Sequence, residues 1–426
     1  MGLPYHIRTL CYPDRLARIF AFQPHRYSAK AGSLENLVTQ PYDKISPQMQ
    51  ARYLSLSPYN LVRLILGERF SIDTSADNVY TRSAALLADW IKTGILARDP
   101  EPGLYAYFQK FTVPDTGETR ERKGFIGLGA VEDYSAGVVH RHEQTLSGPK
   151  KDRMELLRNT RAHFGQIFML YPDPELAIDR ILDQAATAGP PAMQVEDEYG
   201  AVHRVWKISD PATVARIREL MADKKLLIAD GHHRYETALA FHKEDRGLKD
   251  AEKVMMTFVN AHSPGLEILA THRVLGGLAG FDATRFANAI QARRLASVEE
   301  LKGVFRSAAP GKIRIGLALG SGEIRLYERD RKPRELDVKV LHEELLGGVL
   351  GISEEAVREQ RHIEYVRGID AACAKVREGA QIAFLLEPAT VEQVAAVAFS
   401  GGVMPQKSTD FYPKLLSGLT IYKLEN

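Results

Sequence analysis

Short apolar runs that end in polar or turn-forming residues recur along the chain and predict buried strands. Leu226–Ala229, Lys253–Val259 and Leu266–Ala270 are runs of this kind. Leu61–Leu66, which Gly67 closes, predicts another. Runs this short favour strands, because helices usually extend over more than ten residues.

Amphipathic periodicity predicts helices between these runs. From Asn78 to Thr93 apolar residues recur at helical spacing, and Gly94 takes the usual position after a helix end. Ser46 is a candidate N-cap with a proline after it, which predicts a helix over Pro47–Leu56.

Strands and helices are mixed along the whole chain, so the expected fold class is α/β, in the mixed α+β sense, with mixed sheets. A strand–turn–helix unit around residue 230 is the expected core. The glycine-rich stretch Gly276–Gly280 predicts a hinge or linker. We therefore expect an N-terminal α/β region (1–130), a central region (131–275) and a C-terminal α/β region (276–426).

Five polar or permissive residues, Asp230-Gly-His-His-Arg234, occupy the turn between a buried strand and the next helix. Gly231 permits a sharp turn or a close approach to a ligand. The first amides of a helix favour an anion, and His232, His233 and Arg234 add donors and positive charge. A plain surface turn needs only one Gly or Asp. The residues therefore favour a phosphate or carboxylate site.

Composition narrows the classes of function. The chain has 426 residues, 45% hydrophobic and 26% charged, with a net charge of +2, enough for two or three domains. So small a charge, without basic runs and interleaved aromatics, disfavours nucleic-acid binding. No apolar stretch reaches the length of a membrane span, and the start lacks a signal-peptide core. Cys11 and Cys373 form no metal or redox motif, which suits a reducing cytoplasm.

A second polar cluster lies between residues 139 and 153. Three side chains in its first half could bind a metal: His140, His142 and Glu143. They are only a partial set of zinc ligands. Three cations in its second half precede an expected helix that starts at Met154: Lys150, Lys151 and Arg153. This arrangement favours a phosphate-facing loop, with a solvated charge run as the alternative.

Two further polar segments complete the candidate chemistry. Thr271-His-Arg273 ends a strand, where ligands of α/β sheets tend to bind, and Lys407-Ser-Thr-Asp410 places a lysine beside two hydroxyls. Phosphoryl transfer uses such a mixture, because cations offset phosphate charge while acids hold Mg²⁺ and take the acceptor's proton. Phosphate-ester hydrolysis uses nearly the same set, so the residues alone leave both reactions open.

Several segments resemble, in one order over almost the full chain, the bacterial and archaeal family catalogued as domain of unknown function 1015. They are Pro41–Ser46, Tyr59–Gly67, His142–Arg153, Ala229–Ala238, Thr271–Arg273 and Met404–Lys414.

The strand, Gly231-His-His-Arg234 and the helix with Ala238 are also similar to the core motif of the ParB/sulfiredoxin superfamily. That resemblance implies that the loop amides, a histidine and Arg234 hold nucleotide phosphates, which makes 131–275 the nucleotide-binding region. Members include DNA-partition proteins, an ATP-using sulfinic-acid reductase and free-serine kinases. The chain has no cysteine near Gly231 and no basic DNA-binding helix pair, so the kinase branch remains.

The leading hypothesis is a cytoplasmic small-molecule kinase that uses Mg²⁺ and ATP or ADP, with free L-serine as a candidate acceptor and no nucleic-acid or membrane partner. A regulatory protein that binds a nucleotide or anion without turnover, and a phosphohydrolase, are the alternatives.

The expected catalytic residues are Asp230, Glu143 and His232, of which Asp230 and Glu143 also bind Mg²⁺. The expected phosphate or nucleotide contacts are Gly231, His233, Arg234, Lys150, Arg153, Lys407, Ser408 and Thr409. The expected substrate contacts are His142, Thr271, His272, Arg273 and Asp43. This hypothesis requires the four polar segments to converge in the fold.

Overall fold

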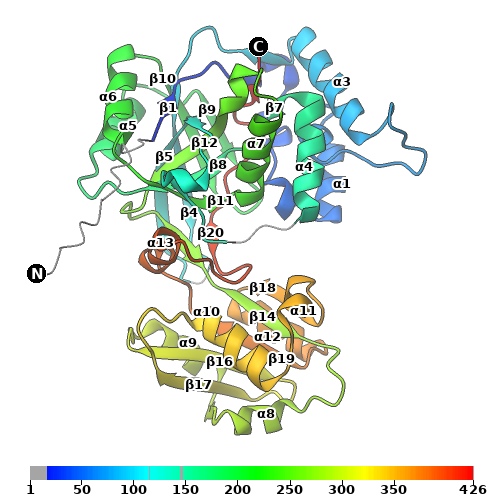
Figure 1. Cartoon of the computed structure of the whole chain (residues 1–426), viewed down its shortest axis with the longest axis vertical. Coiled ribbons are helices and arrows are strands. Elements are labelled where there is room, and N and C mark those ends of the chain that lie inside the picture. Colours follow the sequence, from blue (N-terminus) through cyan, green and yellow to red (C-terminus); the bar gives the residue numbers. More distant parts are fainter. Residues whose placement is uncertain (1–16, 115, 144–146, 426) are drawn as a thin grey trace, which may run out of the picture.

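The computed structural model describes residues 17–114, 116–143 and 147–425 and confirms a mixed α/β fold. Figure 1 shows a larger lobe, which contains the N-terminal half, and a smaller lobe below it. Cys11, Asp115 and residues 144–146 of the second polar cluster lie outside the described residues. Asp115 begins the sequence Asp-Thr-Gly, which predicts a hairpin turn. None of the helices within the described ranges is long and apolar enough to cross a membrane.

A nine-stranded mixed sheet forms the centre of the larger lobe. Its order is β6-β11-β8-β12-β5-β4-β10-β9, and β1 pairs with β5. The strands are β1 (Ile19–Phe20), β4 (Leu104–Thr112), β5 (Thr119–Ala130), β6 (Val139–His140), β8 (Ile167–Tyr171), β9 (Met193–Glu196), β10 (Val202–Ile208), β11 (Leu226–Asp230) and β12 (Lys253–Asn260). The expected strands at 226–229 and 253–259 are confirmed. Strands from both sides of residue 130 share this sheet, while the division into three regions stays a prediction.

Helices cover the two faces of this sheet. They are α1 (Pro47–Leu56), α2 (Val62–Ile65), α3 (Val79–Lys92), α4 (Ser147–Thr160), α5 (Ala177–Thr187), α6 (Pro211–Met221) and α7 (His232–Glu244). Helix α5 contacts β4, β5 and β10, whereas α7 contacts β8 and β12 and packs against α4. Short 3-10 turns are η1 (Ala29–Ala31), η2 (Leu34–Asn36), η3 (Tyr42–Lys44), η4 (Tyr134–Ala136) and η5 (Lys249–Glu252).

The predicted N-cap of α1 is confirmed, because the Ser46 hydroxyl accepts the Met49 amide. Two predictions were wrong. Residues 62–65 form helix α2 instead of a strand, and the buried Asn60 side chain accepts the Val62 amide at its start. A short apolar run alone does not separate a buried strand from a buried helix. Helix α4 begins at Ser147, so the cations of the second polar cluster lie on its first turns and not in a loop before it.

The smaller lobe is built on a six-stranded antiparallel sheet of order β15-β17-β16-β19-β14-β18. Its strands are β14 (Thr271–Leu275), β15 (Arg293–Leu295), β16 (Lys312–Leu319), β17 (Ile324–Asp330), β18 (Ile363–Arg367) and β19 (Ile382–Leu386). Its helices are α8 (Ala283–Ala289), α9 (Val298–Arg306), α10 (Asp337–Val340), a π-helix (Leu341–Val349), α11 (Glu354–Arg358) and α12 (Ile369–Arg377); α13 (Val391–Phe399) leads back toward the larger lobe.

The C-terminal segment returns to the larger lobe. Strand β20 (Asp410–Tyr412) pairs with β13 (Glu267–Leu269), and β21 (Tyr422–Lys423) pairs with β7 (Ala162–His163). The small sheet of β2 (His25–Tyr27) and β3 (Leu96–Arg98) lies beside it, where His25 bridges to Ile421. This return places residues 404–414 next to the turn after β11.

Candidate functional site

The turn between β11 and α7 has a backbone that only glycine readily adopts. Gly231 is the N-cap of α7 with φ 95° and ψ 27°. A Cβ atom added there would lie 3.1 Å from the Arg234 guanidinium. The glycine therefore provides both a left-handed conformation and the space in which Arg234 folds back over the turn.

Asp230 lies between two cations. Its Oδ2 accepts from an Arg234 Nη at 2.7 Å, and its Oδ1 accepts from Lys414 Nζ at 3.1 Å. Burial raises the pKa of Asp230, but Lys414, Arg234 and Lys44 together outweigh burial and hold that pKa well below its usual range. Asp230 is therefore a weak proton acceptor, and both carboxylate oxygens are already occupied.

Lys414 continues the network into the space between the lobes. It is 8% exposed and also pairs with Asp410 at 3.1 Å. Asp410 in turn accepts from Arg367 Nε at 2.7 Å and lies 4.0 Å from Lys44. Burial raises the pKa of Asp410, but Lys414, Lys44 and Arg367 bring it down to about 2. One chain of charges thus joins the turn after β11 to β18 of the smaller lobe.

The second polar cluster meets the 404–410 loop directly. The ring of His142 is hydrogen-bonded through Nε2 to Thr409 Oγ1 at 2.9 Å. The Lys407 amide donates to Glu143 Oε1 at 3.0 Å, and the Met404 amide donates to the His142 carbonyl at 2.7 Å. The loop is therefore held against the end of β6.

Two buried histidines lie edge to face beside this contact. The ring centroids of His142 and His232 are 4.7 Å apart, with 77° between the planes. Burial lowers the pKa of His142 to about 3 and that of His232 to about 4. Both imidazoles are therefore neutral at pH 7 and add no positive charge to the site.

The segment at the start of β14 anchors the same loop from the smaller lobe. Arg273 is buried and donates to the carbonyls of Gln406 at 3.1 Å and Lys407 at 3.2 Å. Burial lowers its pKa to about 10, so it remains charged at pH 7. His272 is buried and accepts the Leu386 amide at 3.2 Å. Thus the four polar segments do converge, with Arg273 holding the loop through its backbone.

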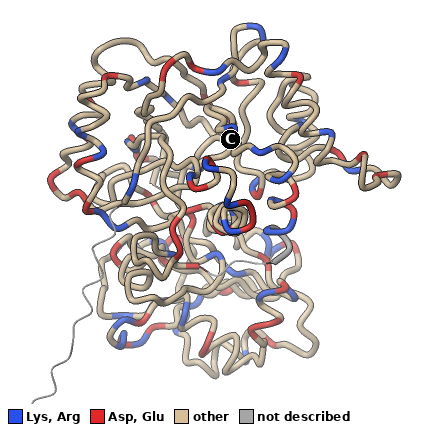
Figure 2. The backbone as a smooth tube through the Cα atoms, turned by 45° about the horizontal axis from the view of Figure 1, so that its top comes forward, with Lys and Arg blue, Asp and Glu red and all other residues tan. Residues whose placement is uncertain are grey.

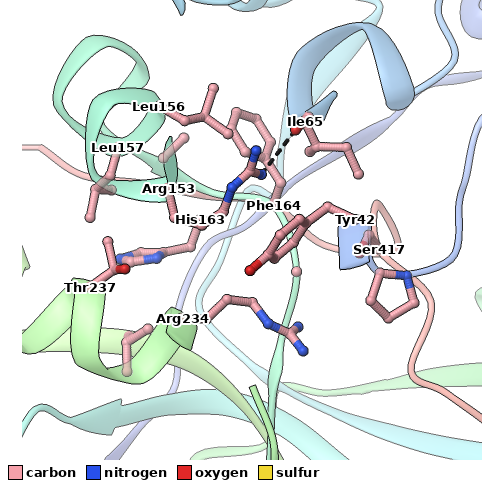
Figure 3. Close-up of a pocket in the computed structure, with 14 residues that line it drawn as sticks. Tyr42, Ile65, Arg153, Leu156, Leu157, His163, Phe164, Arg234, Thr237 and Ser417 are labelled. Carbon is pink, nitrogen blue, oxygen red and sulfur yellow. Dashed lines mark hydrogen bonds between the residues drawn. The ribbon is translucent and has the colours of Figure 1, made fainter. Parts of the chain in front are cut away.

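Two cavities lie along this charge network. The larger, about 530 Å³, is between the lobes. Its polar lining includes Lys44, Thr271, Arg367, Lys407, Thr409 and Lys414. The smaller, about 70 Å³, is lined by Tyr42, Arg153, His163, Arg234, Thr237 and Ser417, among others. Figure 3 shows Arg153 and Arg234 on either side of Tyr42, with Arg153 bonded to the Ile65 carbonyl at 2.9 Å and 4.1 Å from the Tyr42 ring centre.

Four further predicted site residues, Asp43, Lys150, His233 and Ser408, line neither of these cavities. Lys150 pairs with Glu236, and Ser408 donates its hydroxyl to the Pro405 carbonyl. Asp43 is exposed on η3, and His233 is partly buried, which lowers its pKa. The functional roles assigned to all these residues stay predictions.

Sequence reasoning missed three cations of the larger cavity: Lys44, Arg367 and Lys414. Lys44 and Lys414 stand inside the motifs at 41–46 and 404–414, so the motifs could have suggested them. Arg367 lies at the end of an ordinary strand, and nothing in its local pattern marks it.

Magnesium ligands were expected at Asp230 and Glu143. Because Asp230 accepts from a cation on each oxygen and Glu143 Oε1 accepts an amide, this pair does not fit a carboxylate cage for Mg²⁺. Over the described part of the chain, no group of three or more His, Cys, Asp or Glu side chains could hold a metal ion.

Comparisons with known proteins give one family match. The family described as "Protein of unknown function (DUF1015)" matches residues 19–343. No curated protein matches the chain.

Solved structures show a distant likeness. A free serine kinase mutant in complex with ADP is 13% identical, with a TM-score of 0.37, 68% of this chain and 89% of that chain covered. A conserved hypothetical protein from Pyrococcus furiosus is 14% identical, with a TM-score of 0.33 and coverage of 66% and 91%. SbnI with a C-terminal truncation, from Staphylococcus aureus, is 14% identical, with a TM-score of 0.35 and coverage of 69% and 87%. Likeness at this level does not establish a shared activity.

Proposed function

This chain belongs to the DUF1015 family, and we propose that it is a nucleotide-dependent kinase that phosphorylates a hydroxyl of a small molecule. Free L-serine is the first acceptor to test, with ATP or ADP as the donor. The observation that carries this proposal is the larger cavity, where cations from the N-terminal segment, the smaller lobe and the C-terminal segment surround one space.

The cavity suits a polyphosphate in size and charge. Ligand cavities usually measure about 300–1,000 Å³, and this one has about 530 Å³. Burial lowers the pKa of Lys44, and the charges of Lys414 and Lys407 lower it further, while Asp410 and Asp43 act in the opposite direction. These cations repel one another in a partly buried place. A bound phosphate chain would offset that repulsion, and this is the physical reason to place the nucleotide here.

In the proposed reaction, Lys44, Lys407 and Arg367 hold the donor phosphates. The acceptor hydroxyl attacks the terminal phosphorus, the bond from that phosphorus to the bridging oxygen breaks, and the acceptor's proton passes to a carboxylate. We assign the proton to Glu143, because Asp230 is held ionised between two cations. Asp230 instead positions Arg234 and Lys414. Mg²⁺ would enter with the nucleotide phosphates.

The smaller cavity is a suitable place for the acceptor's carboxylate. Arg153 and Arg234 line it, and Arg234 links it to Asp230 and the larger cavity. Arg153 already pairs with Asp152, and Arg234 also donates to the Gln166 carbonyl, so the acceptor's carboxylate would share these donors. A guanidinium binds a carboxylate well, because its planar donors match the two oxygens. An amino acid with a short hydroxyl side chain could then reach from this cavity toward Glu143.

A regulatory protein that binds a nucleotide without turnover is the second candidate. The observation that favours it is that Asp230 and Asp410 are both engaged in ion pairs, which makes them poor proton acceptors. The kinase proposal therefore depends on Glu143 as the base.

Purified protein incubated with ATP or ADP, Mg²⁺ and L-serine tests the proposal. Phosphoserine formation supports the kinase, phosphate release alone indicates a hydrolase, and binding without product indicates the regulator. Glu143→Gln keeps the oxygen that accepts the Lys407 amide. It should bind nucleotide normally while its kcat falls by about 10²–10⁴-fold, the usual effect of losing a general base.

Nucleotide titrations of cation variants test the cavity itself. Lys44→Met should weaken nucleotide binding by about tenfold or more, because a charged hydrogen bond to phosphate is lost. Arg234→Ala should lose nucleotide-dependent activity while remaining folded. Lys339→Met is the matched control, because Lys339 is 54% exposed on α10. Unchanged nucleotide affinity in Lys44→Met would rule out the assigned nucleotide site, and an unchanged KM for the acceptor in Arg234→Ala would rule out the assigned acceptor site.

A further inference from the structure

A second cation-lined cavity lies at the other end of the larger lobe. It measures about 260 Å³, and its lining includes Phe20, His25, Arg98, Lys253, Tyr422 and Lys423. These residues come from the β1–β2 segment, β3, β12 and β21. In Figure 1 this part of the chain is near the C-terminus, at the end of the molecule opposite the smaller lobe. The cavity is therefore separate from the site between the lobes.

Two donors at this cavity lack a partner. His25 is 6% exposed, and its Nδ1 has no hydrogen-bond partner within the described ranges. Lys423 is partly buried, and its ammonium group makes no ion pair or hydrogen bond with any side chain or carbonyl of residues 17–114, 116–143 and 147–425. Lys423 is therefore a cation of the cavity wall that is available to an acceptor, and the buried His25 ring beside it has one nitrogen that makes no hydrogen bond within the described residues.

The surrounding charges repel cations here. Burial lowers the pKa of Lys423, and the charge of Arg161 lowers it further, while Glu425 raises it. Burial also lowers the pKa of His25, with Arg98 as the next cause. The two acids of the lining are already engaged, since Glu425 pairs with Arg98 at 3.1 Å and Asp250 accepts the Glu425 amide at 3.0 Å. An anion in the cavity would relieve this excess of positive charge.

Aromatic rings also line this cavity. Phe20 and Phe22 line the cavity beside Tyr422, and Lys253 lies 5.3 Å from the Phe20 ring centre. Tyr422 is itself stacked on His163, with ring centroids 6.0 Å apart. The lining thus combines apolar rings with cations, and the two meet at Phe20 and Lys253.

We propose that this cavity binds a small organic anion, with a phosphate or carboxylate group at Lys423 and His25 and a short apolar part against Phe20 and Tyr422. The site is distinct from the proposed nucleotide site, so its ligand is an effector or a second substrate and not the donor. The proposal does not depend on the kinase assignment.

Calorimetric titration of the full chain with phenyl phosphate and with benzoate tests this site and separates the two head groups. We expect at least one probe to bind, and Lys423→Met to weaken that binding by about tenfold or more, as the loss of a charge-assisted hydrogen bond predicts. Without a probe, Lys423→Met should melt at or above the wild-type temperature, because it removes an unpaired and partly buried charge. The absence of binding by either probe, or equal affinity in Lys423→Met, would overturn the proposal.

Lys44→Met serves as the control for the other cavity. It should bind the same probe as tightly as the wild type, although it loses nucleotide affinity. Probe binding that is lost in Lys44→Met and kept in Lys423→Met would place the probe between the lobes and overturn the second site. Because nucleotide and probe titrations are separate, failure of one proposal leaves the other standing.

Discussion

At the scale of single residues, Asp230 has its role set by its neighbours. It connects Arg234 at the small cavity to Lys414 at the large one. Its position after a strand and before a glycine suggested a catalytic acid. Its catalytic role stays a prediction, and our proposal gives it a positioning role instead, because a carboxylate held ionised by two cations accepts a proton poorly.

Asp230→Asn should destabilise the protein by about 3 kcal/mol, the lower end of the range for breaking a buried ion pair. The reason is that Lys414, which is 8% exposed, would keep only Asp410 as a partner. Urea unfolding measures the difference. Asp330→Asn, in an ion pair whose aspartate is 88% exposed, is the control and should change the midpoint little. A similar small effect at both positions would contradict the network described here.

Gly231→Ala should cost about 1–3 kcal/mol in stability and also displace Arg234. The left-handed backbone penalises any side chain, and the new methyl group would lie 3.1 Å from the guanidinium. Gly137→Ala measures the destabilisation caused by the left-handed backbone alone, because Gly137 has φ 70° and no atom within 4 Å of an added Cβ. Thermal unfolding of both variants gives the difference. Equal destabilisation would mean that the contact with Arg234 is unimportant.

Asp410 makes stability depend on acid pH. Its pKa in the folded chain is about 2, below the value of about 3.9 for an unfolded chain. A lowered pKa means that the stabilising contribution is complete above pH 4 and is lost as the pH falls through 2. The contribution is about 2.6 kcal/mol. Unfolding free energies of the wild type and Asp410→Asn, measured from pH 5 to 2, should therefore converge. A difference between the two unfolding free energies that stays constant from pH 5 to 2 would show that Asp410 does not make stability depend on pH.

At the scale of elements, the 404–410 loop depends on β14. Arg273→Met would leave the carbonyls of Gln406 and Lys407 without their donor, a loss of about 1–3 kcal/mol. We expect faster hydrogen exchange over residues 405–409 and weaker nucleotide binding through Lys407. Arg325→Met, in β17 and paired with Glu323, is the control and should leave both unchanged. Unaltered exchange in Arg273→Met would refute the anchoring role.

The local sequence pattern was enough to predict an element where a single strong feature, such as an N-cap or an apolar run, determined its structure. The capped helix at 47–56 and the strand at 226–230 have sequence patterns that no neighbour overrides. Residues 62–65 differ, because the Asn60 side chain donates to the Asn36 carbonyl at 2.8 Å and accepts at the helix start. That partner lies 24 residues away, so no local window contains the reason for the helix.

At the scale of the whole molecule, one hydrophobic cluster extends through both lobes. It includes Phe168 of β8, Phe411 of β20, and Ile315 and Phe384 of the smaller sheet. A contiguous core favours cooperative unfolding. Scanning calorimetry should therefore show one transition, which a saturating nucleotide moves to higher temperature. Two resolved transitions, only one of them moved by the nucleotide, would show that the lobes unfold independently.

The sequence by itself determined the mixed α/β class, most strands and helices, and the polar segments that meet at the site, because strand and helix patterns and turn chemistry act over a few residues. Only the tertiary structure decided which of these side chains face a cavity. Arg367 joins the site because β18 ends there, and Asp230 is held ionised because the C-terminal segment brings Lys414 back to it. Electrostatic environment depends on neighbours that are distant along the chain, and no local pattern encodes them.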